Sequence, residues 1–180
     1  TSWGTTLAGL LARGGHDVRI LARTEDEARQ AAGSSGCRVT SDPALAFDCV
    51  DHILWAVPSQ SMRANAQSVA PYLQNPVRHI SVAKGLEVDT GMRMTEVLND
   101  TLPAVSMAGL CALSGPNLAK EIAACLPAAA VVASLDAAVL RDVQALFSSP
   151  RFMTLPSDDV VGVELAGALK NIVALGAGMM

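Results

Sequence analysis

The chain has 180 residues, about half of them apolar, and a formal net charge of −4, a composition that fits one globular domain and part of a second. Its basic residues are scattered and its aromatic residues are only three Phe, two Trp and one Tyr, which argues against nucleic acid as a partner. The four cysteines lack CxxC spacing and disulfide density, which indicates a reducing cytoplasm, and the three histidines have no spacing that predicts a metal site.

Apolar periodicity and turn residues predict strands that alternate with helices. Helices are expected over residues 1–13, 25–32, 40–47, 59–73, 91–99, 118–125 and 136–147. Strands are expected at residues 16–22, 52–57, 79–83, 107–113, 128–134 and 152–155, with a loop over 33–36. This alternation is typical of an α/β fold, in which helices flank a parallel sheet with right-handed crossovers.

The first predicted helix has the character of the second half of a βαβ unit. It opens with small residues around Gly4, and a strand and a charged residue follow it. Gly4 fits the third glycine of a G-x-G-x-x-G turn, at which a helix N-terminus faces a pyrophosphate. A small residue needed for helix–strand packing would explain Gly4 equally well. On the first interpretation, the preceding strand is expected upstream of Thr1.

Arg23 lies at the end of the strand that follows this helix. A carboxylate at that position would bind the 2′-hydroxyl of NAD, whereas an arginine can pair with the 2′-phosphate of NADP. Glu25 and Asp26 follow closely and leave a role on the ribose open. The pattern therefore favours NADP(H) over NAD(H).

Three polar turns directly follow predicted strands, at residues 57–60, 84–87 and 114–117. Because the carboxyl ends of strands form the ligand crevice of an open α/β sheet, we expect these turns to meet there. Lys84 precedes a glycine and can hold its ammonium group in that crevice, although a single loop lysine is usually a surface residue. The turn at Gly115 leads into a helix N-terminus, which is either an anion site or an ordinary turn.

Residues 158–180 predict one long apolar helix with Ser157 as its N-cap. Glu164, Lys170 and Asn171 interrupt its apolar run and lie on or beside one face. A transmembrane span is not expected, because these three polar residues would lie near its centre. Lys170 either snorkels to the surface or faces a paired charge, a water-filled cleft or a substrate.

Five segments stand out, in order over nearly the whole chain: SWGTTLA, WAVPSQ, VAKGLE, LSGPNLAKEIA and SDDVVGVELAGALKNIVALGAG. Together they resemble the bacterial-type NAD(P)-dependent sn-glycerol-3-phosphate dehydrogenases. The resemblance implies a Rossmann-like NAD(P)-binding domain over residues 1–156, followed over residues 157–180 by the first helix of an all-helical substrate domain. It also implies interconversion of dihydroxyacetone phosphate and sn-glycerol 3-phosphate for glycerophospholipid synthesis in the cytoplasm, by a homodimer when full length.

The same resemblance implies roles for individual positions. Cofactor contacts fall on Ser2, Trp3, Arg23, Lys84 and Ala119, with Gly4 in the glycine turn. Substrate contacts fall on Lys84, Gly115, Asn117, Lys170 and Asn171. Lys170 matches the catalytic lysine, which acts as the proton acceptor. Asn117 departs from the family, which usually has Ser or Thr there, and the helical domain is expected to continue beyond Met180.

The lysines suit this chemistry. A lysine desolvated among small and apolar residues is suited to general acid–base work, so Lys170 would exchange the proton with the carbinol oxygen. Lys84, remaining cationic, would polarise the carbonyl and orient the substrate.

Two alternatives remain open. One is a related hydroxyacid dehydrogenase or reductase, such as a ketopantoate reductase or a 6-phosphogluconate-type enzyme, and the other is a truncated nucleotide-binding module without catalysis.

Overall fold

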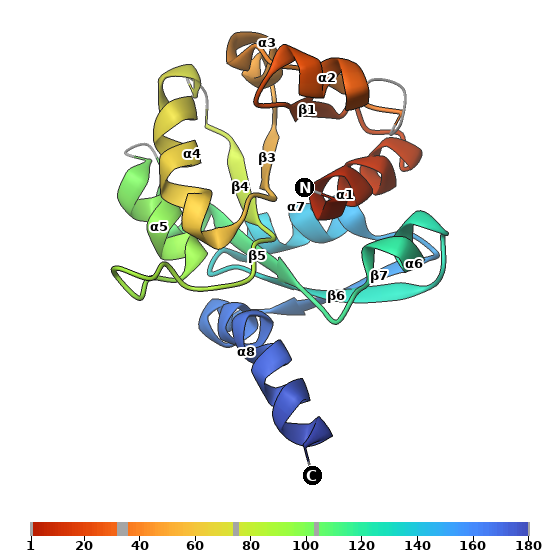
Figure 1. Cartoon of the computed structure of the whole chain (residues 1–180), viewed down its shortest axis with the longest axis vertical. Helices are drawn as coiled ribbons and strands as arrows, with labels where there is room; N and C mark the ends of the chain where they lie inside the picture. The colour runs from red at the N-terminus through yellow and green to blue at the C-terminus, as the bar shows by residue number, and fades with distance from the viewer. Residues whose placement is uncertain (1, 32–35, 74–75, 103–104, 180) are drawn as a thin grey trace.

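The computed structural model describes residues 2–31, 36–73, 76–102 and 105–179 (Figure 1). The main sheet has the strand order β3-β4-β5-β6-β7. These strands are β3 His52–Trp55, β4 Arg78–Ser81, β5 Leu110–Ser114, β6 Ala128–Ala133 and β7 Phe152–Ser157. A second, parallel pair is formed by β1 Arg19–Leu21 and β2 Arg38–Thr40. Residues 33–35 of the loop predicted over 33–36 lie outside the described residues.

Helices flank the sheet, so the predicted α/β class is confirmed. They are α1 Ser2–Arg13, α2 Glu25–Ala31, α3 Pro43–Phe47, α4 Met62–Val69, α5 Met94–Thr101, α6 Ala119–Ala123, α7 Ala137–Phe147 and α8 Val160–Gly178. Short 3-10 turns are η1 Ser59–Ser61, η2 Ala70–Tyr72 and η3 Met107–Gly109. The helix predicted over 59–73 is therefore α4 with a 3-10 turn at each end, and the second of these contains Pro71, which cannot donate a helical hydrogen bond.

The expectation of an all-parallel sheet is wrong at one position. β5 and β6 pair antiparallel, with Ala112 opposite Ala133 and Ser114 opposite Val131, whereas the other neighbouring strands run parallel. The pairing direction was not visible in the sequence, because a buried apolar run looks the same in either direction. Strand β2 was also missed, because three residues are too few to show a period.

The start of the last helix also differs from the prediction. Ser157 belongs to β7 rather than capping the helix. The N-cap is Asp159, whose carboxylate accepts a hydrogen bond of 2.8 Å from the backbone N–H of Gly162. Ser157 supports this turn by accepting from the N–H of Asp159 at 3.1 Å. A hydroxyl and a carboxylate two residues apart are both good caps, so local sequence does not decide between them.

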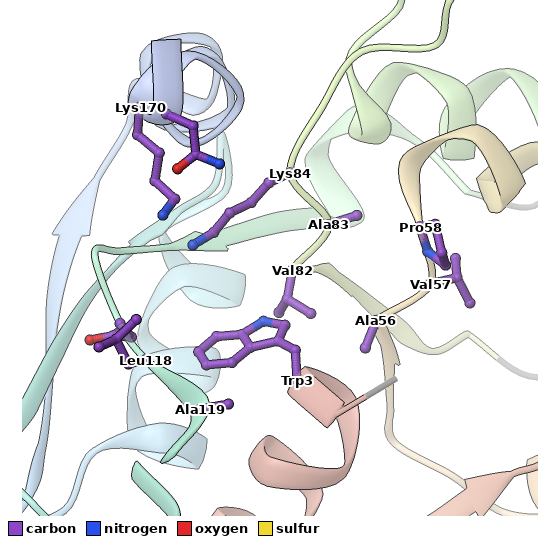
Figure 2. A pocket seen from close by; sticks show the side chains of 12 residues that line it. Trp3, Ala56, Val57, Pro58, Val82, Ala83, Lys84, Leu118, Ala119 and Lys170 are labelled. Carbon is purple, nitrogen blue, oxygen red and sulfur yellow. The ribbon is translucent and has the colours of Figure 1, made fainter. Parts of the chain in front are cut away.

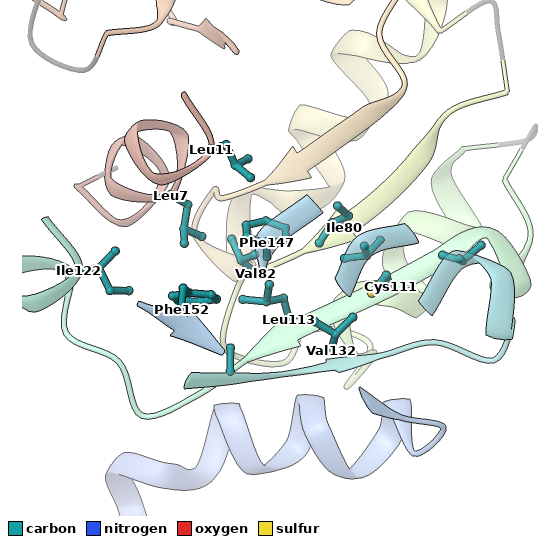
Figure 3. Packing of buried hydrophobic residues seen from close by; sticks show 13 residues of the cluster. Leu7, Leu11, Ile80, Val82, Cys111, Leu113, Ile122, Val132, Phe147 and Phe152 are labelled. Carbon is teal, nitrogen blue, oxygen red and sulfur yellow. The ribbon is translucent and has the colours of Figure 1, made fainter. Parts of the chain in front are cut away.

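Two apolar clusters cover the two faces of the main sheet. On one face, α1 and α7 pack on the strands through Leu7, Val143 and Phe147, which are at most 2% exposed (Figure 3). On the other face, α4 and α5 pack through a second cluster that includes Met62 and Leu98. Strand residues alternate between the two clusters, as expected for a sheet that is covered on both sides.

Helix α8 lies across the sheet on the side away from α1 and α7 (Figure 1), where Val160 packs on Ala112 and Ala133. By length and composition alone it could cross a membrane, and only 17% of that apolar window is buried. Several of its large apolar side chains are exposed, namely Leu169, Ile172, Val173 and Leu175.

A buried histidine lies inside the second cluster. His79 is 1% exposed and stacks beside Trp55, whose indole Nε1 donates to its Nδ1 at 3.1 Å. Burial lowers the pKa of His79 to about 4. The imidazole is therefore neutral at pH 7, and protonation of Nδ1 would place two donors against each other.

This burial predicts a loss of stability in acid. Because the folded-state pKa of His79 is lowered, its contribution is fully present above about pH 6.5 and is lost as the pH falls toward 4. We expect the free energy of unfolding of the wild type to fall by about 3 kcal/mol more than that of His79→Gln between pH 7 and 4. Urea unfolding across this range measures both, with the exposed-site variant His16→Gln as the matched control. The prediction would be contradicted if the free energy of unfolding changed equally with pH in the wild type and in His79→Gln.

Candidate active site

A cleft of about 410 Å³ opens where β3 and β4 end (Figure 2). Its walls come from α1, from the two strand-end loops, from the turn before α6 and from α8. The lining residues are Trp3, Ala56, Val57, Pro58, Val82, Ala83, Lys84, Asn117, Leu118, Ala119, Lys170 and Asn171. The three polar turns predicted to meet at the strand ends all reach this region, as the parallel order of β3, β4 and β5 requires.

Lys84 projects into this cleft from the end of β4. Its Nζ donates to the backbone carbonyl of Gly115 at 2.8 Å and lies 5.7 Å from the centroid of the Trp3 ring. Burial lowers the pKa of Lys84, and the positive charge of Lys170 lowers it further. The two ammonium groups are therefore close enough to interact electrostatically.

The backbone after Lys84 is tightly held. Gly85 has a φ of +144°, and a Cβ there would come within 2.5 Å of the Ser59 hydroxyl, so only glycine fits. The Gln60 side chain donates to the carbonyl of Leu86 at 2.6 Å and accepts from the N–H of Val88 at 3.0 Å. The turn after β3 thus clamps the loop after β4, which orients Lys84.

Lys170 reaches the cleft because β5 and β6 are antiparallel. After this reversal β6 and β7 run away from the cleft, so α8 runs back toward it along β5. Gly167 allows the close approach: a Cβ there would lie 2.6 Å from the Ser114 hydroxyl and 3.7 Å from Cγ of Lys84. Lys170, about one turn further along, then faces the cleft beside Asn171.

The surroundings of Lys170 differ from the expectation. Its side chain is exposed rather than desolvated among Ala, Gly and Leu, because α8 contacts the domain mainly through its first half. Of the surroundings considered for Lys170, a paired charge is not seen, since none of the described carboxylates forms an ion pair with it. In Figure 2 its ammonium points toward Lys84.

Two hydrogen-bond donors in the cleft lining are shielded from solvent. They are Nε1 of Trp3 and Nδ2 of Asn117, and neither has a partner among the described residues. A buried donor without a partner costs free energy, so it indicates a polar group that is supplied from elsewhere.

The remaining predicted residues lie around the cleft or away from it. Ala119 lines it, and Gly115 contributes the carbonyl that Lys84 binds. Ser2 and Gly4 flank Trp3 in the first turn of α1 without lining the cleft. Arg23 lies apart from it at the end of β1, exposed, with its guanidinium paired to Glu27 at 2.5 Å.

Sequence reasoning missed the apolar wall of the cleft and one buried ion pair. The wall is formed by Ala56, Val82, Ala83 and Leu118, which carry no chemical signature. The ion pair joins Arg93 to Glu164 at 2.8 Å. Glu164 was noted as a polar residue on an apolar helix, but a partner 71 residues away leaves no local pattern.

An α/β sheet with a cleft at its strand ends, facing a helix N-terminus, defines a Rossmann-like domain. The chain belongs to the family described as the N-terminus of NAD-dependent glycerol-3-phosphate dehydrogenase, whose model matches residues 1–140.

Proteins that are similar in sequence or in structure carry names from the same family. The chain is 39% identical to glycerol-3-phosphate dehydrogenase [NAD(P)+] of Corynebacterium aurimucosum, covering 99% of this chain and 57% of the relative. It is 40% identical to that of Dehalococcoides mccartyi, covering 100% of this chain and 54% of the relative. The crystal structure of glycerol-3-phosphate dehydrogenase from Coxiella burnetii superimposes with a TM-score of 0.86 at 29% identity, covering 99% and 57% of the two chains. The chain thus spans little more than half the length of these relatives.

The close approach at Gly167 predicts opposite effects for two glycine substitutions in α8. Gly167→Ala should lower the free energy of unfolding by about 1 kcal/mol or more, because its Cβ meets the Ser114 hydroxyl. Gly176→Ala, with no atom within 4 Å of its Cβ, should raise it by about 0.5 kcal/mol. Urea unfolding measures both.

The Ser114→Ala background identifies the contact. If the Ser114 hydroxyl is the obstacle, Gly167→Ala should cost less there than in the wild type. An equal cost in both backgrounds would assign the effect to another contact.

Proposed function

We propose that the protein carries out the NAD(P)-dependent interconversion of dihydroxyacetone phosphate and sn-glycerol 3-phosphate, for glycerophospholipid synthesis. The observation that carries this proposal is that Lys84 and Lys170, which are far apart in the sequence, line the same cleft. The chain that brings them together belongs to the glycerol-3-phosphate dehydrogenase family. In this proposal, residues 1–156 form the nucleotide-binding domain and residues 157–180 begin a helical substrate domain.

The cleft fits a dinucleotide with a flat ring. Trp3 and Asn117 in its lining carry hydrogen-bond donors that have no partner among the described residues. Other lining residues, among them Ala56 and Ala83, have small apolar side chains that leave the cleft open. The N-terminus of α1 lies beside this space, and a helix N-terminus favours the binding of anionic groups such as phosphates. When bound, the nicotinamide supplies the hydride chemistry, and the protein must orient the substrate and move a proton.

The two lysines divide that work. In the direction of reduction, Lys170 donates a proton to the oxygen on C2 of dihydroxyacetone phosphate, and in the reverse direction it takes that proton back. Lys84, held by the Gly115 carbonyl, points its ammonium at the same oxygen and stabilises the negative charge that develops there. The exposure of Lys170 in the described chain leaves it accessible to a substrate. Substrate contacts at Gly115, Asn117 and Asn171 belong to the same proposal.

The setting of the enzyme completes the proposal. We infer a cytoplasmic homodimer without a membrane span. Three polar residues of α8 support a helix packed in protein, since Glu164 is buried in an ion pair and Lys170 and Asn171 face the cleft. The exposed apolar side chains of α8 would then be covered by further protein.

Loss of NADPH absorbance on addition of dihydroxyacetone phosphate to the full-length gene product tests this function. We expect rapid turnover, with ketopantoate as a parallel arm that stays inactive. Lys170→Ala should lower kcat by about 100-fold or more while NADPH binding persists, because it removes the group that transfers the proton. Lys120→Ala, an exposed lysine outside the cleft, is the control. Turnover of ketopantoate alone, or full activity of Lys170→Ala, would overturn the assignment.

The position of Arg23 predicts a preference for NADPH. Arg23→Ala should raise the KM for NADPH by about tenfold and leave that for NADH nearly unchanged, because only NADPH carries the 2′-phosphate. Arg29→Ala is the matched control, since Arg29 lies on the adjacent helix α2 with its own acidic partners, Glu25 and Asp26. Equal changes for both cofactors would show that Arg23 does not contact the 2′-phosphate.

A further inference from the structure

Glu164 is buried where α8 meets the N-terminus of α5. Its carboxylate accepts from Arg93 Nη1 at 2.8 Å, from the backbone N–H of Thr95 at 2.9 Å and from the Thr95 hydroxyl at 2.5 Å. The Glu164 side chain is 6% exposed, so these contacts replace its hydration almost completely. A carboxylate with so many donors is held in one place.

The same anchor is connected to Lys84. The loop between Lys84 and α5 folds back on itself, because Leu86 and Arg93 form an antiparallel bridge. The N–H of Glu87 donates to the carbonyl of Met92 at 2.9 Å, and the Glu87 carboxylate accepts twice from the Arg63 guanidinium. Arg93 is therefore fixed relative to the segment that begins at Lys84.

The anchor is also connected to Lys170. Glu164 and Lys170 lie six residues apart in one continuous helix, a rise of about 9 Å. Between them, Gly167 lies against Ser114 and the Lys84 side chain. The second half of α8 has few contacts with the rest of the described chain, so its direction depends on the first half, which is held by Val160, Glu164 and Gly167.

We propose that Glu164 is a positioning residue that holds Lys170 over Lys84 through its buried contacts with Arg93 and Thr95. This inference rests on the proposed function of the two lysines. An ion pair buried only for stability would be no better than a pair of apolar residues. Here the pair joins the two segments that carry the cleft lysines, and a geometric role accounts for this placement.

Glu164→Gln tests the proposal in the full-length protein. Gln keeps the size and one acceptor oxygen but loses the charge that binds Arg93. We expect kcat with dihydroxyacetone phosphate to fall by about 10- to 100-fold, because a small misplacement of Lys170 is enough for such a loss, and the KM for NADPH to change less than about twofold. Glu96→Gln is the matched control: Glu96 also pairs with Arg93, at 2.7 Å, but its side chain is 42% exposed and its hydrogen bonds go to Arg93 rather than to α8. It should keep kcat near the wild-type value.

A second measurement does not depend on turnover. The reactivity of Lys84 toward an amine-acylating reagent, followed by peptide mass spectrometry across a pH series, reports the pKa of its ammonium group. In the wild type this pKa should lie below the ordinary value for lysine, because of burial and the charge of Lys170. In Glu164→Gln it should rise toward the ordinary value as α8 moves away, whereas Glu96→Gln should leave it unchanged.

The outcomes separate the two proposals. Wild-type kcat and an unshifted Lys84 titration in folded Glu164→Gln would overturn the positioning role. An inactive wild type whose Lys84 titration still responds to Glu164→Gln would overturn the proposed function and support the positioning. Should Glu164→Gln fail to fold, Thr95→Val decides: it removes one donor to Glu164 and keeps the shape, so we expect a smaller shift in the same direction. No shift in that folded variant would equally overturn the proposal.

Discussion

Two positive charges are held close together in one partly buried cleft, and many of the contacts around the cleft serve to hold them there. Lys84 and Lys170 repel each other, and burial adds to the cost of the Lys84 charge. Neither lysine pairs with a carboxylate among the described residues, so attraction to a counter-charge does not hold them. Their positions depend instead on how the backbone segments that carry them are fixed.

The fold fixes those segments by close packing and by contacts outside the cleft. Gly85 and Gly167 let the loop after β4 and helix α8 approach their neighbours more closely than a Cβ would allow. Gln60 clamps the loop, and Glu164 ties α8 to the start of α5. The cleft itself keeps shielded donors on Trp3 and Asn117 that no described residue satisfies. Close packing outside the cleft thus fixes the segments that carry the two lysines.

The reversal between β5 and β6 gives this frame its particular form. In an all-parallel sheet, β7 would end at the cleft and the following helix would lead away from it. With β6 and β7 reversed, α8 starts beside Ala112 and Ala133, at the end of the sheet away from the cleft, and runs toward the cleft. The residues of α8 that face the cleft are therefore Lys170 and Asn171, in the second half of the helix, rather than residues of its first turn.

The sequence by itself determined the α/β class, most of the helices and strands, and the lysines at the end of β4 and on the last helix. These features depend on local periodicity, on turn residues and on short motifs, all of which are visible within a few residues. The tertiary structure decided the antiparallel pairing of β5 and β6, the partner of Glu164, the exposure of Lys170 and the pairing of Arg23 with Glu27. Pairing direction and exposure depend on which segments meet in space, and a contact such as Arg93–Glu164 joins residues whose separation along the chain leaves no pattern to read.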